Sequence, residues 1–321
     1  MNGDARLWCD RLVRGLGQHE FDIYALSRSE RQEDEGWIQL PPQVSRVRTA
    51  PLWTAEDDGV VHGRRARRRF AECFGELAAA VCVAPAVLDG SEASGGVTAS
   101  EASRGVVADR FGSALYGLAE LARDEGGLVG ALRSEGAVRA LERACRAPGA
   151  LRAARTARVP DLLCVAAQVE RALRPLSLDW YEDDGLGSVD LCHAAAGGEA
   201  ALPGLLALHF AGVPLLVTEY GVQLRAHYLA SSAAEESPAV RALLAAFHGA
   251  LAAEVYRRAA LITPGNTHAR RWQERCGADR AKLRTVYPGM EAARFAEVGE
   301  RADGSGCVDP DSVVWVHASG A

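Results

Sequence analysis

The sequence predicts an α/β protein in which a parallel sheet is flanked by helices. In the second half of the 321-residue chain, short apolar runs alternate with amphipathic helical segments, a pattern that implies right-handed crossovers between parallel strands. One of these runs, 213–218, is apolar almost throughout, as expected for a strand that is buried on both faces. Polar or glycine-containing sequence follows four of the runs, at the strand ends where such sheets bind ligands.

The composition narrows the class of protein. A hydrophobic content of 48% and a charged content of 24% are typical of a globular chain. The net charge of −6 gives no general attraction to nucleic acid or anionic membranes. No stretch approaches the roughly 18–20 uninterrupted apolar residues of a membrane helix, and the first residues lack the apolar region of a signal peptide. We therefore expect a soluble, cytoplasmic protein.

The eight cysteines predict reduced thiols and no metal site. They lie far apart in the sequence, without a CxxC pair or a Cys/His cluster of zinc-binding spacing. Scattered thiols are typical of proteins from a reducing compartment. Because no base lies near them in sequence, we do not expect nucleophilic catalysis at Cys9, Cys192 or Cys276.

The first part of the chain predicts one helix and two strands. Apolar residues recur at helical spacing over 7–16. Residues 21–26 alternate as a short strand, the polar stretch 28–42 predicts a loop, and 44–47 predict a second strand. The order is helix, strand, strand, with no strand predicted before the first helix.

The middle of the chain predicts a block of helices. An apolar stripe spaced as on one helix face runs through 64–82, and 106–174 reads as helical with breaks near Pro148 and Pro160. We interpret about 64–175 as a helical insertion between two α/β halves. Residues 88–105, rich in Gly, Ser and Ala, predict a mobile loop that limited proteolysis should cut first.

The second half predicts the main sheet. Its predicted elements are strands over 189–193, 213–218, 260–263 and 283–287, with helices over 200–210, 240–255 and 267–276 between them.

Polar residues at these strand ends predict a ligand cleft. Because each follows a strand running in the same direction, they should converge at one end of the sheet, with Cα atoms within roughly 10–15 Å of one another. The candidate substrate-binding residues are His193, Glu219, Tyr220, Gly221, Arg225 and Asn266.

Each candidate also has a structural interpretation. For His193 a capping or core histidine is favoured over a ligand contact, whereas Glu219 with Arg225 is equally explained as an ion pair or helix cap. Tyr220 has a packing interpretation. Asn266 fits a Pro-Gly turn in which it caps the next helix, although a helix start can also receive an anion. The run of five arginines within 64–69 suggests nucleic acid, but the acidic residues 56–58 just upstream favour a solvated helix face.

Several of the same segments resemble family 4 glycosyltransferases of the PelF-like group. The similarity runs from about residue 7 to residue 316 and is weakest over 50–180. The segments that carry it are WCDRLVRGL at 8–16, LVTEYGVQLR at 216–225, and ITPGNT at 262–267 with Arg271-Trp272 and Gly277-Ala278-Asp279.

The resemblance implies a GT-B fold, in which two Rossmann-like domains face each other across a cleft. Such enzymes transfer a sugar from a nucleotide-sugar donor, here expected to be a UDP-sugar, to a glycan acceptor. Anomeric configuration is retained and no metal or cofactor takes part. The resemblance further implies exopolysaccharide or related glycan synthesis, with a membrane-associated synthesis complex as a partner. Residues 1–312 would form the N-terminal, acceptor-side domain, and 313–321 would begin the donor-binding domain.

The chain departs from the family's pattern at both ends and at two turns. The family has a strand and a glycine-rich turn ahead of the helix at Trp8, and a Gly-Arg after the strand at 313–316; neither is present here. Tyr220 replaces a histidine, and Pro288-Gly289 replaces Asn-Gly. We therefore expect a chain truncated at both ends, in which loss of a central strand leaves two neighbouring strands with unpaired edges.

The resemblance favours a glycosyltransferase whose acceptor side this chain forms, with Glu219 and Arg225 orienting sugar hydroxyls. The alternatives are a non-catalytic binding or scaffold protein and, less favoured, a different nucleotide-using α/β enzyme. A departing diphosphate needs cations or helix N-termini, which the family supplies from the donor-binding domain. We therefore expect no turnover of UDP-glucose by this polypeptide alone.

Overall fold

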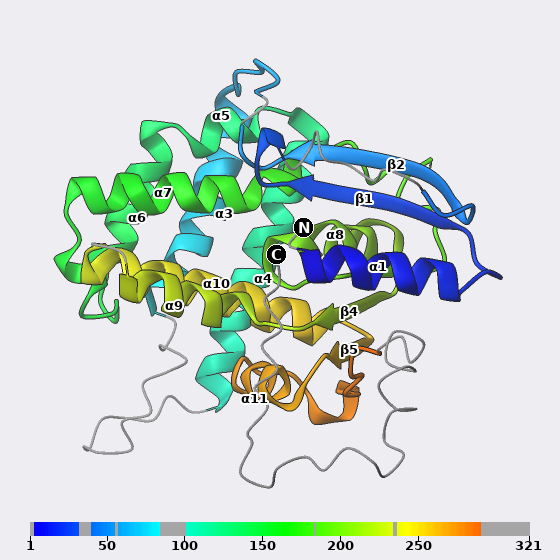
Figure 1. Ribbon diagram of the computed structural model, residues 1–321. Coiled ribbons are helices and arrows are strands. Elements are labelled where there is room, and N and C mark those ends of the chain that lie inside the picture. The colour runs from blue at the N-terminus through cyan, green and yellow to red at the C-terminus, as the bar shows by residue number, and fades with distance from the viewer. Residues whose placement is uncertain are drawn as a thin grey trace, which may run out of the picture.

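The computed structural model confirms a mixed α/β fold with parallel strands and flanking helices (Figure 1). The structure describes residues 3–31, 40–54, 57–83, 101–182, 184–233 and 236–289. The predicted mobile loop at 88–105 lies outside these residues up to position 100. Positions 101–105 are the start of a helix and not part of a loop, so that end of the prediction was wrong.

The strands form two parallel sheets. In the first, β1 (Phe21–Ser27) pairs with β2 (Val44–Pro51). In the second, β3 (Cys192–Ala194), β4 (Leu215–Glu219) and β5 (Leu261–Pro264) lie in that order. All three strand pairs are parallel, as the alternation of short strands and helices predicts.

The strands β1 and β3 each have one edge with no strand beside it among the described residues. Among the described strands, β1 pairs only with β2 and β3 pairs only with β4. Strands in the interior of an α/β sheet are usually covered on both faces, yet β1 is only partly buried along most of its length. The predicted single sheet is therefore divided into two among the described residues.

The predicted strand over 283–287 is wrong as a full strand. Only Leu283 forms a bridge, to Ile262, although the backbone N–H groups of Arg284 and Val286 donate to the carbonyls of Ile262 and Pro264. Pro264 ends β5 and has no N–H group, so it cannot supply the return hydrogen bond that would continue the ladder. The segment is an extended edge, not a sixth strand.

Helices make up most of the structure. The helix α1 (Gly3–Gly15) precedes β1. The block that we predicted as an insertion contains α3 (Arg64–Val83), α4 (Glu101–Glu125), α5 (Leu128–Leu132), α6 (Glu135–Arg146) and α7 (Val159–Leu173), with the short 3-10 helices η1 (Ala154–Thr156) and η2 (Arg174–Ser177). The second half adds η3 (Gly198–Ala201), α8 (Leu202–Ala211), α9 (Gln223–Ala233), α10 (Pro238–Arg258), α11 (Thr267–Arg275) and η4 (Arg280–Lys282).

Three features of these helices differ from prediction. The helical block is interrupted at Gly126 and Gly127, which both have positive φ, as well as near Pro148. Pro160 begins a helix, in the first turn of α7, and does not break one. The helix α9 was not predicted, because its sequence carries no regular apolar stripe.

One core joins the helical block to the second half. The long helix α10 packs against α3, α4, α7 and α9 (Figure 1). Phe111 of α4 and Phe247 of α10, both fully buried, meet edge to face with ring centroids 6.2 Å apart. The buried residues of the block and those of the three-stranded sheet therefore belong to one continuous cluster.

The same helix, α10, is the one described helix that is long and apolar enough to cross a membrane. Most of its most apolar stretch, 72%, is buried inside the protein. That burial is typical of the core helix of a soluble fold.

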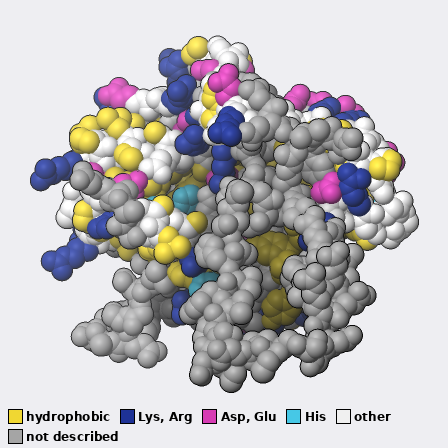
Figure 2. All heavy atoms as spheres, in the orientation of Figure 1, with side chains coloured by type: hydrophobic (Ala, Val, Ile, Leu, Met, Phe, Trp, Pro, Cys, Tyr) yellow, Lys and Arg dark blue, Asp and Glu magenta, His cyan; other side chains and the backbone are white. Residues whose placement is uncertain are grey.

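The arginine run forms an ion-paired helix face. Arg68 pairs with Glu72, and Arg69 pairs with Glu120 and Asp124 of α4. The predicted solvated helix face is confirmed, since most of these arginines are exposed. The countercharges of Arg68 and Arg69 lie one turn along α3 and on α4. In the view of Figure 2, Lys and Arg side chains lie among Asp and Glu side chains along the top of the molecule.

Candidate functional site

Three polar side chains lie in a row across the second sheet. The Nε2 atom of His193 on β3 lies 2.7 Å from the Thr218 hydroxyl on β4. That hydroxyl lies 2.5 Å from the Thr263 hydroxyl on β5, which donates to the Val217 carbonyl at 3.3 Å. In the parallel register Thr218 pairs directly with Thr263, and His193 pairs with the residue two before Thr218. The three side chains therefore share one face of the sheet.

The helix α1 packs against this polar row. The Trp8 ring meets the His193 ring edge to face at 5.5 Å and the Tyr220 ring at 6.0 Å. Arg11, one turn further along α1, donates to the Gly289 carbonyl beyond the sheet edge. These contacts place α1 at the carboxyl end of β3 and β4, where parallel sheets bind ligands.

His193 is a neutral, partly accessible imidazole. Desolvation by the surrounding protein lowers its pKa to about 4. The residue as a whole is nevertheless exposed at the surface. The lowered pKa leaves the His193 ring uncharged at neutral pH. A neutral ring can accept a hydrogen bond through one nitrogen while it donates through the other.

Glu219 lies at the same end of the sheet as His193 but on the opposite face. Successive side chains of a strand point to opposite sides, so Glu219 points away from its neighbour Thr218. Its carboxylate accepts from the Tyr256 hydroxyl at 2.5 Å, from the Gln273 amide at 3.0 Å and from the Gly197 N–H. Burial raises its pKa, and these three hydrogen bonds oppose the rise. The prediction that Glu219 and His193 lie at the same end of the sheet is thus confirmed. The Glu219 side chain, however, makes its hydrogen bonds inside the protein.

Asn266 is a helix cap. It is the N-cap residue of α11, with its side-chain oxygen accepting from the Ala269 N–H at 2.7 Å. Its amide nitrogen donates to the Tyr220 carbonyl at 3.3 Å. The structural interpretation made from the Pro-Gly turn is confirmed, and both halves of the amide are in use.

The ring of Tyr220 packs over Gly265. A Cβ atom on Gly265 would lie only 2.2 Å from the nearest Tyr220 ring carbon. Burial raises the pKa of Tyr220, and the neighbouring Trp8 opposes the rise. Tyr220 therefore joins the first turn after β4 to the turn after β5.

Gly221 and Arg225 are the least constrained of the predicted residues. A Cβ atom added to Gly221 would meet no atom within 4 Å, so packing among the described residues does not require a glycine there. Arg225, in the first turn of α9, forms no ion pair with Glu219 or with any other described residue. The predicted Glu219–Arg225 ion pair is therefore wrong.

Substituting the two turn glycines should separate their roles. Gly265→Ala is expected to lower the free energy of unfolding by about 1–3 kcal/mol, because the new methyl group overlaps the Tyr220 ring. Gly221→Ala should change it by less than about 0.5 kcal/mol, the usual range of a surface substitution. Urea denaturation of both variants and the wild type measures the difference, and equal effects would contradict this packing.

A second histidine with a lowered pKa lies outside the predicted site. His248 of α10 has its pKa lowered to about 4 by burial, and its Nδ1 atom has no hydrogen-bond partner. Its ring lies 5.3 Å from that of His227 on α9. Nothing in the helical pattern of 240–255 distinguishes this histidine from a surface residue, so sequence reasoning missed it.

His248 should make the protein sensitive to acid. Because its folded pKa lies below the unfolded value near 6.5, the unfolded state binds the proton more readily, and stability falls as pH drops from about 6.5 toward 4. His248→Gln should remove about 1–2 kcal/mol of the stability loss between pH 7 and pH 5. Denaturant unfolding at both pH values tests this, with the exposed His268→Gln as control. An unchanged pH dependence would refute it.

The structure describes seven of the eight cysteines. The described cysteines are all free, and burial raises the pKa of Cys9 and Cys192 to about 11 and that of Cys276 to about 12. Such thiols stay protonated at neutral pH and are poor nucleophiles. Two of the scattered cysteines meet in the core, since the Sγ atoms of Cys82 and Cys145 are 3.6 Å apart. Within the described segments, no group of three potential metal ligands occurs.

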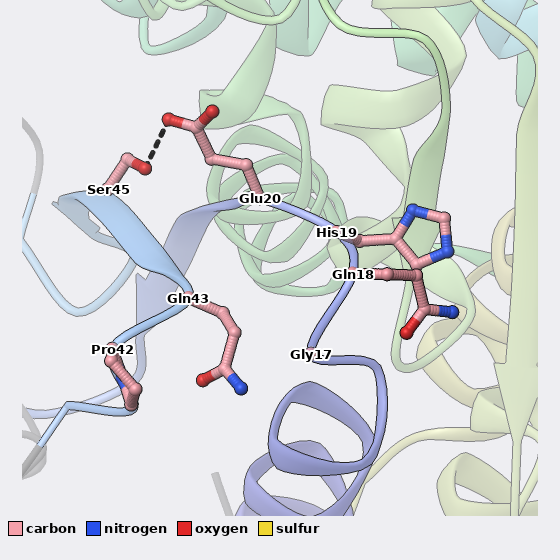
Figure 3. A pocket seen from close by; sticks show the side chains of 7 residues that line it. All are labelled: Gly17, Gln18, His19, Glu20, Pro42, Gln43 and Ser45. Carbon is pink, nitrogen blue, oxygen red and sulfur yellow. Dashed lines mark hydrogen bonds between the residues drawn. The ribbon is translucent and has the colours of Figure 1, made fainter.

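A shallow hollow of about 450 Å³ lies elsewhere in the molecule (Figure 3). It is lined by the residues just before β1 and around the start of β2, with Glu20 and Ser45 hydrogen-bonded across it. These are the amino ends of the strands, opposite to the end where parallel sheets bind ligands. We therefore place the candidate site at the carboxyl end, around Trp8, His193 and Tyr220.

Comparison with known proteins identifies a family but no function. No curated protein and no solved structure is detectably similar to the chain. One family model, a domain of unknown function (DUF3492), matches residues 2–281. That span includes α1, both sheets, the helical block and every candidate site residue. The chain therefore belongs to the DUF3492 family.

Proposed function

We propose that this chain is the acceptor-side domain of a retaining, nucleotide-sugar-dependent glycosyltransferase that acts in the cytoplasm in glycan or exopolysaccharide synthesis. Its task in this proposal is to bind the glycan acceptor. The sugar donor, a UDP-sugar, would be held mainly by a separate donor-binding domain. The resemblance of the segments at 8–16, 216–225 and 262–267 to family 4 glycosyltransferases motivates the proposal.

The observation that carries the proposal is the surface formed by Trp8, His193 and Tyr220. Aromatic rings with a few polar groups are the usual lining of small-molecule sites, and Trp and Tyr provide rigid contact area with a polar end. The neutral His193 adds a hydrogen-bond acceptor for a hydroxyl. An uncharged, hydroxyl-rich ligand suits this surface, because the rings and the neutral His193 offer packing area and a hydrogen-bond acceptor.

Binding to the full-length chain tests the proposal directly. Titration with neutral oligosaccharides, followed by tryptophan fluorescence, should show saturable binding in which UDP-glucose does not compete. His193→Ala should weaken that binding about tenfold, equivalent to about 1.4 kcal/mol. The exposed His268→Ala serves as the matched control. No glycan binding, or loss of affinity in both variants alike, would contradict the proposal.

A non-catalytic binding protein is the second candidate. The observation that favours it is that Glu219, the one carboxylate among the predicted site residues, is buried in internal hydrogen bonds. A group held in that way is poorly placed for proton transfer to a ligand. Neither candidate predicts release of UDP from UDP-glucose by this chain alone, which is measured with and without glycan against a heat-inactivated control. Turnover by this chain would exclude the binding protein.

A further inference from the structure

The row of hydroxyls beside His193 contains three close contacts and only two hydroxyl hydrogens. The contacts join His193 Nε2 to Thr218, Thr218 to Thr263, and Thr263 to the Val217 carbonyl. Each hydrogen bond needs one hydrogen, and each threonine hydroxyl supplies one. The carbonyl supplies none. If all three contacts are hydrogen bonds, the third hydrogen has to be on His193 Nε2.

The order of donation follows from the carbonyl end of the row. Val217 O can only accept, so Thr263 donates its hydrogen there. Thr218 then donates to the Thr263 oxygen at 2.5 Å, and its own oxygen is left to accept from His193 at 2.7 Å. Both threonines are buried, Thr218 at 3% and Thr263 at 8% exposed, which limits exchange of these partners for bulk water.

We propose that Thr263 is a positioning residue which, through Thr218, holds His193 as its Nε2–H tautomer and leaves Nδ1 as a hydrogen-bond acceptor for a ligand hydroxyl. Thr263 touches neither the ligand surface nor the imidazole. It acts by occupying the Val217 carbonyl and by accepting from Thr218, so that Thr218 has no hydrogen to offer to His193.

The tautomer has a consequence for ligand choice. The His193 Nδ1 atom forms no hydrogen bond with a described residue, and the ring is partly exposed. A neutral Nδ1 accepts from O–H or N–H donors and repels other acceptors, which favours a sugar hydroxyl over a phosphate or carboxylate oxygen. This second part rests on the proposed function, whereas the tautomer itself does not. The lowered pKa of His193 agrees with a neutral ring at pH 7.

Nitrogen NMR of the uniformly labelled, full-length chain at neutral pH distinguishes the tautomers. The His193 resonances are assigned by their loss in His193→Gln. Wild type should show a protonated Nε2 and an unprotonated Nδ1. In Thr263→Val the Thr218 hydrogen becomes free to donate to Nε2, so the two nitrogen shifts should move toward each other as the Nδ1–H tautomer is populated. Thr263→Ser should restore the wild-type spectrum, and Thr156→Val, at an exposed position of η1, should leave it unchanged.

Each outcome has one meaning. A wild-type ring that is protonated on Nδ1 overturns the tautomer, and this result needs no variant. An unchanged spectrum in Thr263→Val overturns the role of Thr263. If Thr263→Val does not fold, Thr263→Ala provides the same test, since it also removes the hydroxyl that accepts from Thr218. A wild-type tautomer as stated, together with no glycan binding, would contradict the proposed function and leave the hydrogen-bonded row standing.

Discussion

Replacing Glu219 by alanine is expected to lower the free energy of unfolding by about 3–5 kcal/mol. The substitution leaves the Tyr256 hydroxyl, the Gln273 amide and the Gly197 N–H without their shared acceptor inside the protein. An unpaired buried donor costs about 1–3 kcal/mol, and the deleted carboxymethyl group leaves a cavity besides. Few single substitutions should cost this fold more.

Urea denaturation measures the loss, with Glu135→Ala as the control on an exposed, i,i+4-paired glutamate. The control should change stability by less than about 0.5 kcal/mol. Glu219→Gln should fall between the two, because its amide oxygen can still accept from Tyr256. A loss below about 1 kcal/mol for Glu219→Ala would mean that the carboxylate does not hold these elements together, and its role as a ligand group would regain support.

Phe111→Ala should also cost about 3–5 kcal/mol, because it removes a fully buried ring that packs on Phe247. The two phenylalanines come from the predicted insertion and from the second half of the chain. Since one core joins them, the variant should still unfold in one transition, shifted as a whole to lower denaturant.

The unfolding of Phe111→Ala is best followed by two probes at once. Tryptophan fluorescence reports on local packing, and far-ultraviolet circular dichroism reports on all helices. Coincident curves are the expected result, with Val106→Ala, an exposed position on the same helix, as the near-neutral control. Separate transitions would show that the helical block unfolds independently of the second half of the chain, as an inserted domain would.

The sequence predicted the sheet direction and most helices because these depend on local patterns. The apolar run at 213–218 and the stripe at 240–255 were sufficient for β4 and α10. The strand at 283–287 was overestimated because a proline in its neighbour, Pro264, ends the ladder, and such cross-strand effects are absent from one strand's own sequence. The helix α9 lacked an apolar stripe and was missed.

The candidate site was predicted in its place but not in its composition. Parallel strands fixed which residues meet at one end, and His193 lies there as expected. Sequence reasoning did not separate the two faces of the sheet, so it grouped Glu219 with His193 and left out Thr218 and Thr263. The signal was available, since residues two apart on a strand share a face and adjacent residues do not. The contact with Trp8, nearly two hundred residues away in sequence, could not be read from any local pattern.

The division of the sheet gives β1 two unlike sides. Alternate residues of a parallel strand direct their backbone groups to one neighbour, and here Phe21 and Ser27 bond toward β2. The amide groups of Asp22, Tyr24 and Leu26 therefore face the edge where no described strand lies. In deuterated water their hydrogens should be replaced sooner than those of Ile23 and Ala25, so that isotope uptake along this one strand rises and falls with every second residue.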